Sequence, residues 1–134
     1  MRLVFEIDPV AQARPRAVRM GRGVRMYDPK KTADFKKQLH FLAQAKHVEP
    51  FQDALSVEIW FYRAVQKSIS KKEHVRRTTG HVRPIVKPDI DNLCKATLDS
   101  FNGILWKDDS QIVDLNLHKF YSDNPRIEIE LEEY

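Results

Sequence analysis

The sequence predicts an α+β (mixed α/β) fold, a single compact domain in which two or three helices pack on an about four-stranded mixed sheet. The chain has 134 residues, of which 42% are hydrophobic and 31% charged, which suits one core and is too short for two domains. Segments with a period of two residues alternate with segments at helical spacing, in the order strand, helix, strand, helix and two strands. No internal repeat interrupts this order, so residues 1–134 are predicted to form one domain.

The first third of the chain predicts a strand, a loop and a helix. Residues 3–7 alternate as a strand does, and Pro9 ends the alternation. Residues 10–26 contain proline, two glycines and five arginines without an apolar period, which predicts a flexible, exposed basic loop. From Thr32 apolar residues recur at helical spacing, and the predicted helix ends before Pro50.

The middle of the chain predicts a core strand and two further helices. Residues 54–62 give the clearest alternation in the protein. Ser70 and Glu73 have the spacing of a capping box, so a short helix is expected through the basic residues 71–77. Residues 90–101 form an amphipathic pattern that Asn102 and Gly103 close.

Two strands are predicted at the end of the chain. Residues 111–120 and 127–131 both alternate between apolar and polar side chains. The Ser-Asp-Asn-Pro sequence at 122–125 is typical of a turn. We therefore expect these two strands to pair as an antiparallel hairpin.

Charge is divided unevenly along the chain. Residues 1–95 hold 20 of the 23 Lys and Arg against 10 acids, whereas residues 96–134 hold 3 against 9. A basic region of this width suggests a polyanionic partner, although a solvated basic face would look the same. Cys94 has no second cysteine to pair with, and charges interrupt every apolar stretch. These features predict a protein of the reducing cytoplasm without a membrane span.

Missing motifs exclude several kinds of site. The chain has no GxxxxGK[ST] loop, no GxGxxG turn and no GxSxG elbow, so neither a nucleotide cofactor nor a hydrolase serine is expected. None of the five histidines falls at HxxxH spacing, which disfavours a zinc site.

Aspartates gather around the predicted helix 90–101. Asp89 and Asp91 precede or begin it, and Asp108 and Asp109 follow it. Pro88 favours extended backbone, in which residues two apart point the same way, so Asp89 and Asp91 are expected on one side. If the chain returns the second pair to the same place, three or four carboxylates share one pocket.

Such a cluster requires a cation, because neighbouring carboxylates repel each other. Oxygen ligands select hard ions, so Mg²⁺ is expected, with Mn²⁺ as a substitute. A metal held in this way activates water against a phosphodiester, and Lys95 would stabilise the phosphate. The alternative also stands: Asp89 and Asp91 could cap a helix, Asp91 and Lys95 could form an i,i+4 pair, and the Asp108–Asp109 pair could belong to a turn.

The string KPDIDNLCKATLDSFNGILWKDDSQIVD resembles the signature of RusA-type Holliday junction resolvases, small dimeric bacterial endonucleases often encoded by phages and prophages. The basic stretch RPRAVRMGRGVRMYDPKKT is similar to family members as well, whereas residues 63–86 match poorly. The resemblance implies a mixed α/β fold and a homodimer. It also implies that Asp89, Asp91 and Asp109 bind the metal, that Asp108 supports them, and that Lys95 is a catalytic or DNA-contacting base.

The hypothesis is a Mg²⁺-dependent endodeoxyribonuclease that resolves four-way DNA junctions by paired incisions in recombination and repair. Two alternatives remain, a less selective phage nuclease for flaps or forks and a non-catalytic basic DNA-binding module. DNA binding is assigned to the basic loop and to the basic residues of the segment 71–87, through Arg14, Arg16, Arg19, Arg22, Arg25, Lys71, Lys72, Arg76, Arg77 and Lys87.

Overall fold

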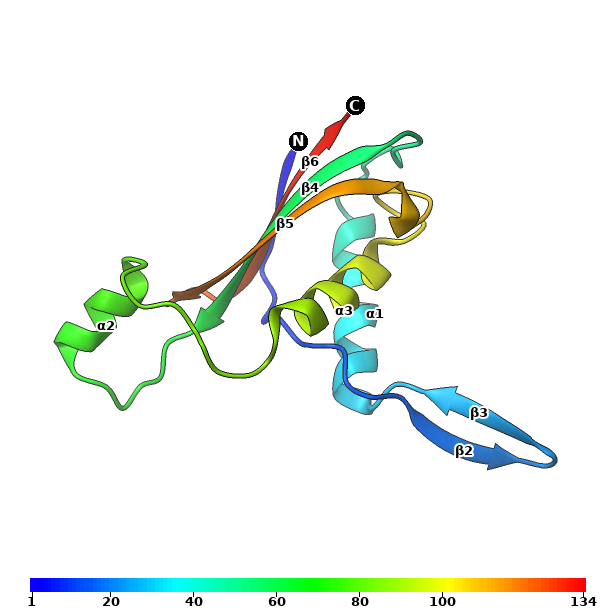
Figure 1. The fold of residues 1–134 in the computed structure, drawn as a ribbon, viewed down its shortest axis with the longest axis horizontal. Coiled ribbons are helices and arrows are strands. Elements are labelled where there is room, and N and C mark those ends of the chain that lie inside the picture. The colour runs from blue at the N-terminus through cyan, green and yellow to red at the C-terminus, as the bar shows by residue number, and fades with distance from the viewer.

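A four-stranded mixed sheet with the order β1-β6-β4-β5 runs through the molecule (Figure 1). A separate two-stranded sheet, formed by β2 and β3, extends away from the rest of the molecule. The computed structural model describes all residues from 1 to 134. Its strands and helices are β1 (Arg2–Phe5), β2 (Arg16–Met20), β3 (Gly23–Tyr27), α1 (Lys30–Gln44), β4 (Leu55–Ala64), α2 (Lys71–Thr78), α3 (Ile90–Phe101), the short 3-10 helix η1 (Asp109–Gln111), β5 (Ile112–Ser122) and β6 (Arg126–Glu133). The predicted mixed α/β fold with a four-stranded sheet is confirmed.

The expected hairpin of the last two strands is wrong. β4 pairs in parallel with β5 and antiparallel with β6, so it separates the two strands that the 122–125 turn connects. The turn sequence reverses the chain but does not decide which strand becomes the neighbour. β4 and β6 take the two interior places, and the inward residues of both are completely or almost completely buried, among them Leu55, Ile59 and Ile129. The crossover that a parallel pair needs runs through α2 and α3.

The core lies between one face of the sheet and the helices α1 and α3, which lie together on that side (Figure 1). Leu39 of α1, Phe101 of α3 and Ile129 of β6 are completely buried there. The buried inward residues of β4 and β6 alternate with more exposed outward ones, which are glutamates in β6 and include Trp60 and Tyr62 in β4. α3 is therefore anchored along its apolar side, and its first turn is held in place for the site described below.

Residues 10–26, expected as a loop, contain most of a β-hairpin. β2 and β3 pair over five residues each, and every residue of both strands is exposed. Gly21 occupies the two-residue turn at φ +59, a conformation that favours glycine. The repeat of Val-Arg-Met on both sides of Gly-Arg-Gly was the signal for this hairpin, but neither strand has the buried face that usually reveals one.

α2 forms as the capping pattern predicted, and the Ser70 hydroxyl accepts a hydrogen bond of 3.2 Å from the Glu73 backbone. The helix buries none of its residues and lies apart from α1 and α3 (Figure 1). None of the helices has both the length and the apolar character that a membrane crossing requires.

Candidate active site

The aspartates at the start of α3 do not act as helix caps. Asp89 occupies the N-cap position in extended conformation, yet its side chain accepts no capping hydrogen bond. Asp91 lies in the first turn, and none of the nine ion pairs in the structure involves Asp91 or Lys95. The capping and i,i+4 alternatives for these residues are therefore not realised, and both carboxylates are left available.

The two aspartates before β5 differ from each other. Asp108 is the N-cap of η1, where its carboxylate accepts a hydrogen bond of 3.0 Å from the Ser110 backbone. Hydrogen bonds from the Ser110 side chain and backbone lower the pKa of Asp108. Asp109 follows at the first position of η1, and the Asn102 amide lies 3.5 Å from its carboxylate. The cap-and-turn alternative thus holds for Asp108, and we leave this residue out of the proposed metal ligands.

Asp91 and Asp109, separated by 18 positions in the chain, border the same small pocket between α3 and β5. The pocket has a volume of about 300 Å³, and Lys95 lies at its rim. Its remaining lining residues are Cys94, Leu98, Asp99, Leu115 and Leu117. Burial raises the pKa of the Cys94 thiol to about 11, and the charges of Asp109 and Asp91 add to the rise. The charges of both carboxylates therefore reach the same thiol, as expected for two side chains that border one pocket.

Asp89 does not join them. It borders a larger pocket of about 910 Å³ on the other side of the α3 N-terminus, and Asp108 borders neither pocket. The expectation that Asp89 and Asp91 point the same way is wrong because α3 begins at Ile90, between them. In helical backbone, unlike extended backbone, two residues separated by one other lie on different sides.

Comparison with known proteins bears on this arrangement. The family model for "Endodeoxyribonuclease RusA" matches residues 6–132. The chain belongs to the RusA endodeoxyribonuclease family. It is also 41% identical over 130 residues to the uncharacterized protein YqaN of Bacillus subtilis (strain 168), an alignment that covers 94% of this chain and 91% of that protein. The resemblance predicted from the aspartate motifs is confirmed, and membership indicates endodeoxyribonuclease activity.

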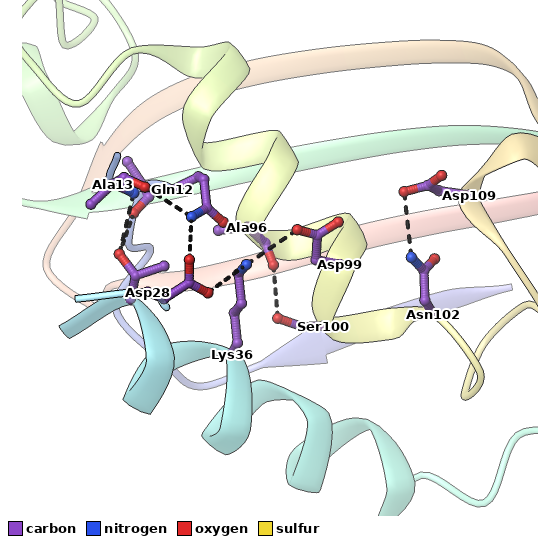
Figure 2. Close-up of polar contacts among 11 residues, drawn as sticks. Gln12, Ala13, Asp28, Lys36, Ala96, Asp99, Ser100, Asn102 and Asp109 are labelled. Atoms are coloured by element: carbon purple, nitrogen blue, oxygen red, sulfur yellow. Dashed lines mark hydrogen bonds and ion pairs between the residues drawn. The ribbon is translucent and has the colours of Figure 1, made fainter. Parts of the chain in front are cut away.

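The RusA-family site contains two positioning residues that the sequence reasoning missed. Asn102 accepts a hydrogen bond of 2.6 Å from the Trp106 indole and directs its amide toward Asp109 (Figure 2). Gln111 accepts hydrogen bonds from the backbone of residues 107 and 108 and donates to the carbonyl oxygens of residues 51 and 53. The spacing Asp-x-x-Gln of a capping box was the available signal for Gln111.

The segment that leads into Asp89 is held by two cations that were also missed. Lys119 of β5 donates hydrogen bonds of 3.0 Å to the carbonyl oxygens of Val86 and Pro88. Arg63 of β4 donates to the carbonyl oxygen of Lys87. Nothing in the local sequence indicates these contacts, since 24 to 33 positions separate the partners.

The carboxylates of this pocket can be compared with the ligands that a divalent metal ion usually has in proteins. No three His, Cys, Asp or Glu side chains form a group that could hold a metal ion. Mg²⁺, however, is usually held by one or two carboxylates together with water and substrate phosphates, rather than by an all-protein cage. Asp91 and Asp109 supply two carboxylates beside an open pocket, so the site fits a Mg²⁺ ion shared with DNA.

The predicted DNA-binding cations fall into two groups. The five arginines of residues 14–25 are exposed, and none forms an ion pair. In α2, Lys71 and Lys72 are exposed, whereas Arg76 and Arg77 both pair with Glu73 at 3.1 Å. Arg77 also lies over the ring of Tyr121, so it has a structural role, and Lys87 borders the larger pocket.

The base of the hairpin is tied to α3 near the site. The backbone N–H of Gln12 donates a hydrogen bond of 2.8 Å to the carbonyl oxygen of Asn92, next to Asp91. Gln12 also donates to Asp28, and Lys36 joins Asp28 to Asp99 of α3 at 3.0 and 3.2 Å (Figure 2). The hydrogen bonds from Lys36 and Gln12 lower the pKa of Asp28. These contacts hold the arginine hairpin at one end of the candidate active site.

Proposed function

We propose that the protein is a Mg²⁺-dependent, structure-selective endodeoxyribonuclease that resolves four-way DNA junctions by paired incisions. One observation carries the proposal: Asp91 and Asp109 come from separate segments, border one pocket, and form no ion pair with a protein cation. Two carboxylates left close together in this way favour a divalent cation. In this proposal the enzyme acts on branched DNA of the bacterial cytoplasm, of cellular or phage origin, in recombination and repair.

Asp91 and Asp109 would hold the metal, with Mn²⁺ as a substitute, and water and DNA phosphates would complete its ligands. When bound, Mg²⁺ would supply a nucleophilic water and neutralise charge on the phosphodiester. Lys95, exposed at the pocket rim, would stabilise the charge that develops on the phosphate. Asn102 would keep the Asp109 carboxylate turned into the pocket.

Hydrolysis as proposed leaves 5′-phosphate ends, so the bond between phosphorus and the 3′ oxygen breaks and that oxygen takes up a proton. The protein's other task is to hold the DNA backbone. The unpaired arginines of the hairpin and Lys71, Lys72 and Lys87 would contact phosphates on the two sides of α3. Binding through phosphates reads the shape of a branch more than its base sequence.

A four-way junction favours a dimer as the working form. The junction has approximate twofold symmetry, and resolution requires one cut in each of two strands. A single site would only nick. We therefore propose that two copies of the chain act together, each with its own pair of Asp91 and Asp109.

Asp91→Asn tests the catalytic assignment. The variant should bind a synthetic junction at least as tightly as the parent protein, because a negative charge near DNA is lost, but should not cleave it with Mg²⁺ or Mn²⁺. Asp109→Asn should lose cleavage as well, whereas Asp34→Asn, an exposed position on α1, should not. Undiminished cleavage by Asp91→Asn would refute the assignment.

Two other functions give different results in the same assay. A less selective nuclease would cut forks, flaps and four-way junctions at similar rates. A non-catalytic binding module would yield no product with any divalent ion. Membership in an endodeoxyribonuclease family and the available carboxylates favour the catalytic proposal.

A further inference from the structure

A cavity of about 910 Å³ lies on the other side of the α3 N-terminus from the pocket of Asp91 and Asp109, and the proposed cleavage reaction does not use it. Its walls come from the loop before the hairpin, the first turns of α1 and α3, the C-terminal ends of β4 and β5, and the segment 84–89. Seven of its 23 lining residues lie in the segment 63–86, where the resemblance to the RusA signature is weak, so the family motifs do not account for the cavity. A volume of this size is typical of sites for small molecules and cofactors.

The cavity has more positive than negative charge. The lining residues that are charged and form no ion pair are four cations and two acids, namely Lys31, Arg63, Lys87, Lys119, Asp8 and Asp89. Lys119 and Arg63 are held by carbonyl oxygens of residues 86–88, which fix the two cations without neutralising them. Charges of one sign gathered in a walled cavity attract an ion of the opposite sign. The cavity therefore favours an anionic ligand.

The remaining wall is largely apolar and includes Val10, Pro29, Val65 and Val86. Apolar walls with a few charged groups are the usual composition of a small-molecule site, since the walls bind the apolar part of the ligand and the charges fix its orientation. A nucleotide has both parts, because its base has flat apolar faces and its phosphate is negatively charged. The composition of the cavity therefore suits a nucleotide.

The cavity lies next to the place at which a DNA strand would be cut. Asp89 and Asn92 border it, whereas Asp91, between them in the chain, borders the candidate active site. The first turn of α3 is therefore the wall between the two, and a strand with its phosphate at Asp91 can place an adjacent nucleotide in the cavity. A base that is paired and stacked in a duplex cannot enter a cavity, and extruding it costs least where it is already unpaired.

We propose that this cavity binds one unpaired nucleotide of the DNA strand, next to the phosphate held at Asp91 and Asp109. The base lies against the apolar wall, and the phosphate lies near Lys31 and Lys87, whose side chains are exposed. The proposal rests on the proposed function, because it takes DNA as the ligand. It adds a substrate class, since an extrahelical nucleotide in a linear duplex should be recognised without a four-way junction.

Binding of a linear duplex with one extrahelical nucleotide tests the proposal, against a fully paired duplex of the same length. Both are titrated in Ca²⁺, so that no strand is cut. The parent protein should bind the first duplex about 10-fold or more tightly than the second, because the second must lose a base pair to fill the cavity. A fluorescent adenine analogue at the extrahelical position should become brighter on binding, because it leaves the neighbouring bases. Equal affinity for the two duplexes overturns the proposal, as does unchanged fluorescence.

A pair of neighbouring substitutions tests the cavity itself. Val86→Trp fills the cavity and should abolish the preference without weakening the binding of paired duplex, and Val86 is 50% exposed, so the fold should tolerate the larger side chain. Ile85→Trp is the matched control, because Ile85 is 95% exposed and does not line the cavity, and it should keep the preference. A folded Val86→Trp variant that keeps the preference overturns the proposal.

A second pair of variants keeps the test decisive if Val86→Trp fails to fold. Lys31→Ala should weaken the binding of the duplex with an extrahelical nucleotide more than that of paired duplex. Lys30→Ala, at an exposed position that does not line the cavity, should affect both duplexes equally. The same response to Lys31→Ala and Lys30→Ala overturns the proposal.

Two further outcomes separate this proposal from its neighbours. A free nucleotide offers the same base and phosphate, so dAMP is titrated as well, and tight binding of dAMP with equal affinity for the two duplexes overturns the assignment to DNA. A parent protein that prefers the duplex with an extrahelical nucleotide but cuts no four-way junction with Mg²⁺ refutes the proposed function and leaves the cavity assignment intact.

Discussion

Replacing Arg16, Arg19 and Arg22 of the hairpin with alanine should change how DNA binding depends on salt. The three side chains are exposed and form no ion pair, so each is free to neutralise one phosphate. Each lost contact reduces the slope of log K against log salt by about 0.9, so three reduce it by about 2.7. Between 50 and 200 mM salt, the parent protein should therefore lose about 40-fold more affinity than the variant.

The assay is fluorescence anisotropy of a labelled four-way junction, titrated with protein at several salt concentrations in Ca²⁺ so that no strand is cut. The matched control replaces the same three arginines with lysine, which retains the charge and should retain the slope. Since the hairpin has no buried residue, neither variant should alter the unfolding midpoint by more than a few degrees. A slope within about 0.5 of the parent value would remove the hairpin from the interface.

Three further predictions concern stability and catalysis. Burial raises the pKa of Glu128, but hydrogen bonds from Arg2 and Arg126 outweigh this effect, so that the pKa is lowered overall. Glu128→Gln should therefore reduce the free energy of unfolding at pH 7, measured in urea, by about 1–3 kcal/mol. That difference should shrink as the pH falls below the ordinary carboxyl value of 4.5, since protonation then removes the same interaction from the parent protein, and a constant difference would contradict it. Asn102→Ala should destabilise the fold by about 1–3 kcal/mol, because the buried Trp106 indole loses its acceptor, and should slow single-turnover cleavage because Asp109 is no longer held. Lys95→Ala should lower kcat by about 100-fold with an unchanged unfolding midpoint, and Lys95→Arg should restore part of the rate; normal cleavage by Lys95→Ala would exclude it from the mechanism.

Helices that are specified by residues close together in the sequence were predictable. The apolar stripe of residues 90–101 yielded α3, and the spacing of Ser70 and Glu73 yielded α2 with the expected cap. The hairpin of residues 16–27 was not predicted, because its strands have no buried face and so no alternation of apolar and polar residues, although the glycine of its turn stands in the sequence. The aspartate motifs were sufficient to identify the family, because their spacing reflects a local chain path.

The sequence by itself determined the helices, the strands of the four-stranded sheet and the residues that mark this as a RusA-family chain, because capping, periodicity and motif spacing act over a few residues. The tertiary structure decided which aspartates meet. Asp109 borders the same pocket as Asp91 because β5, which follows it, pairs with β4 beside α3, whereas Asp89 borders the other pocket because α3 begins at Ile90. That strand order buries the apolar faces of both β4 and β6 in the interior of the sheet, a requirement of the whole core that no single segment contains.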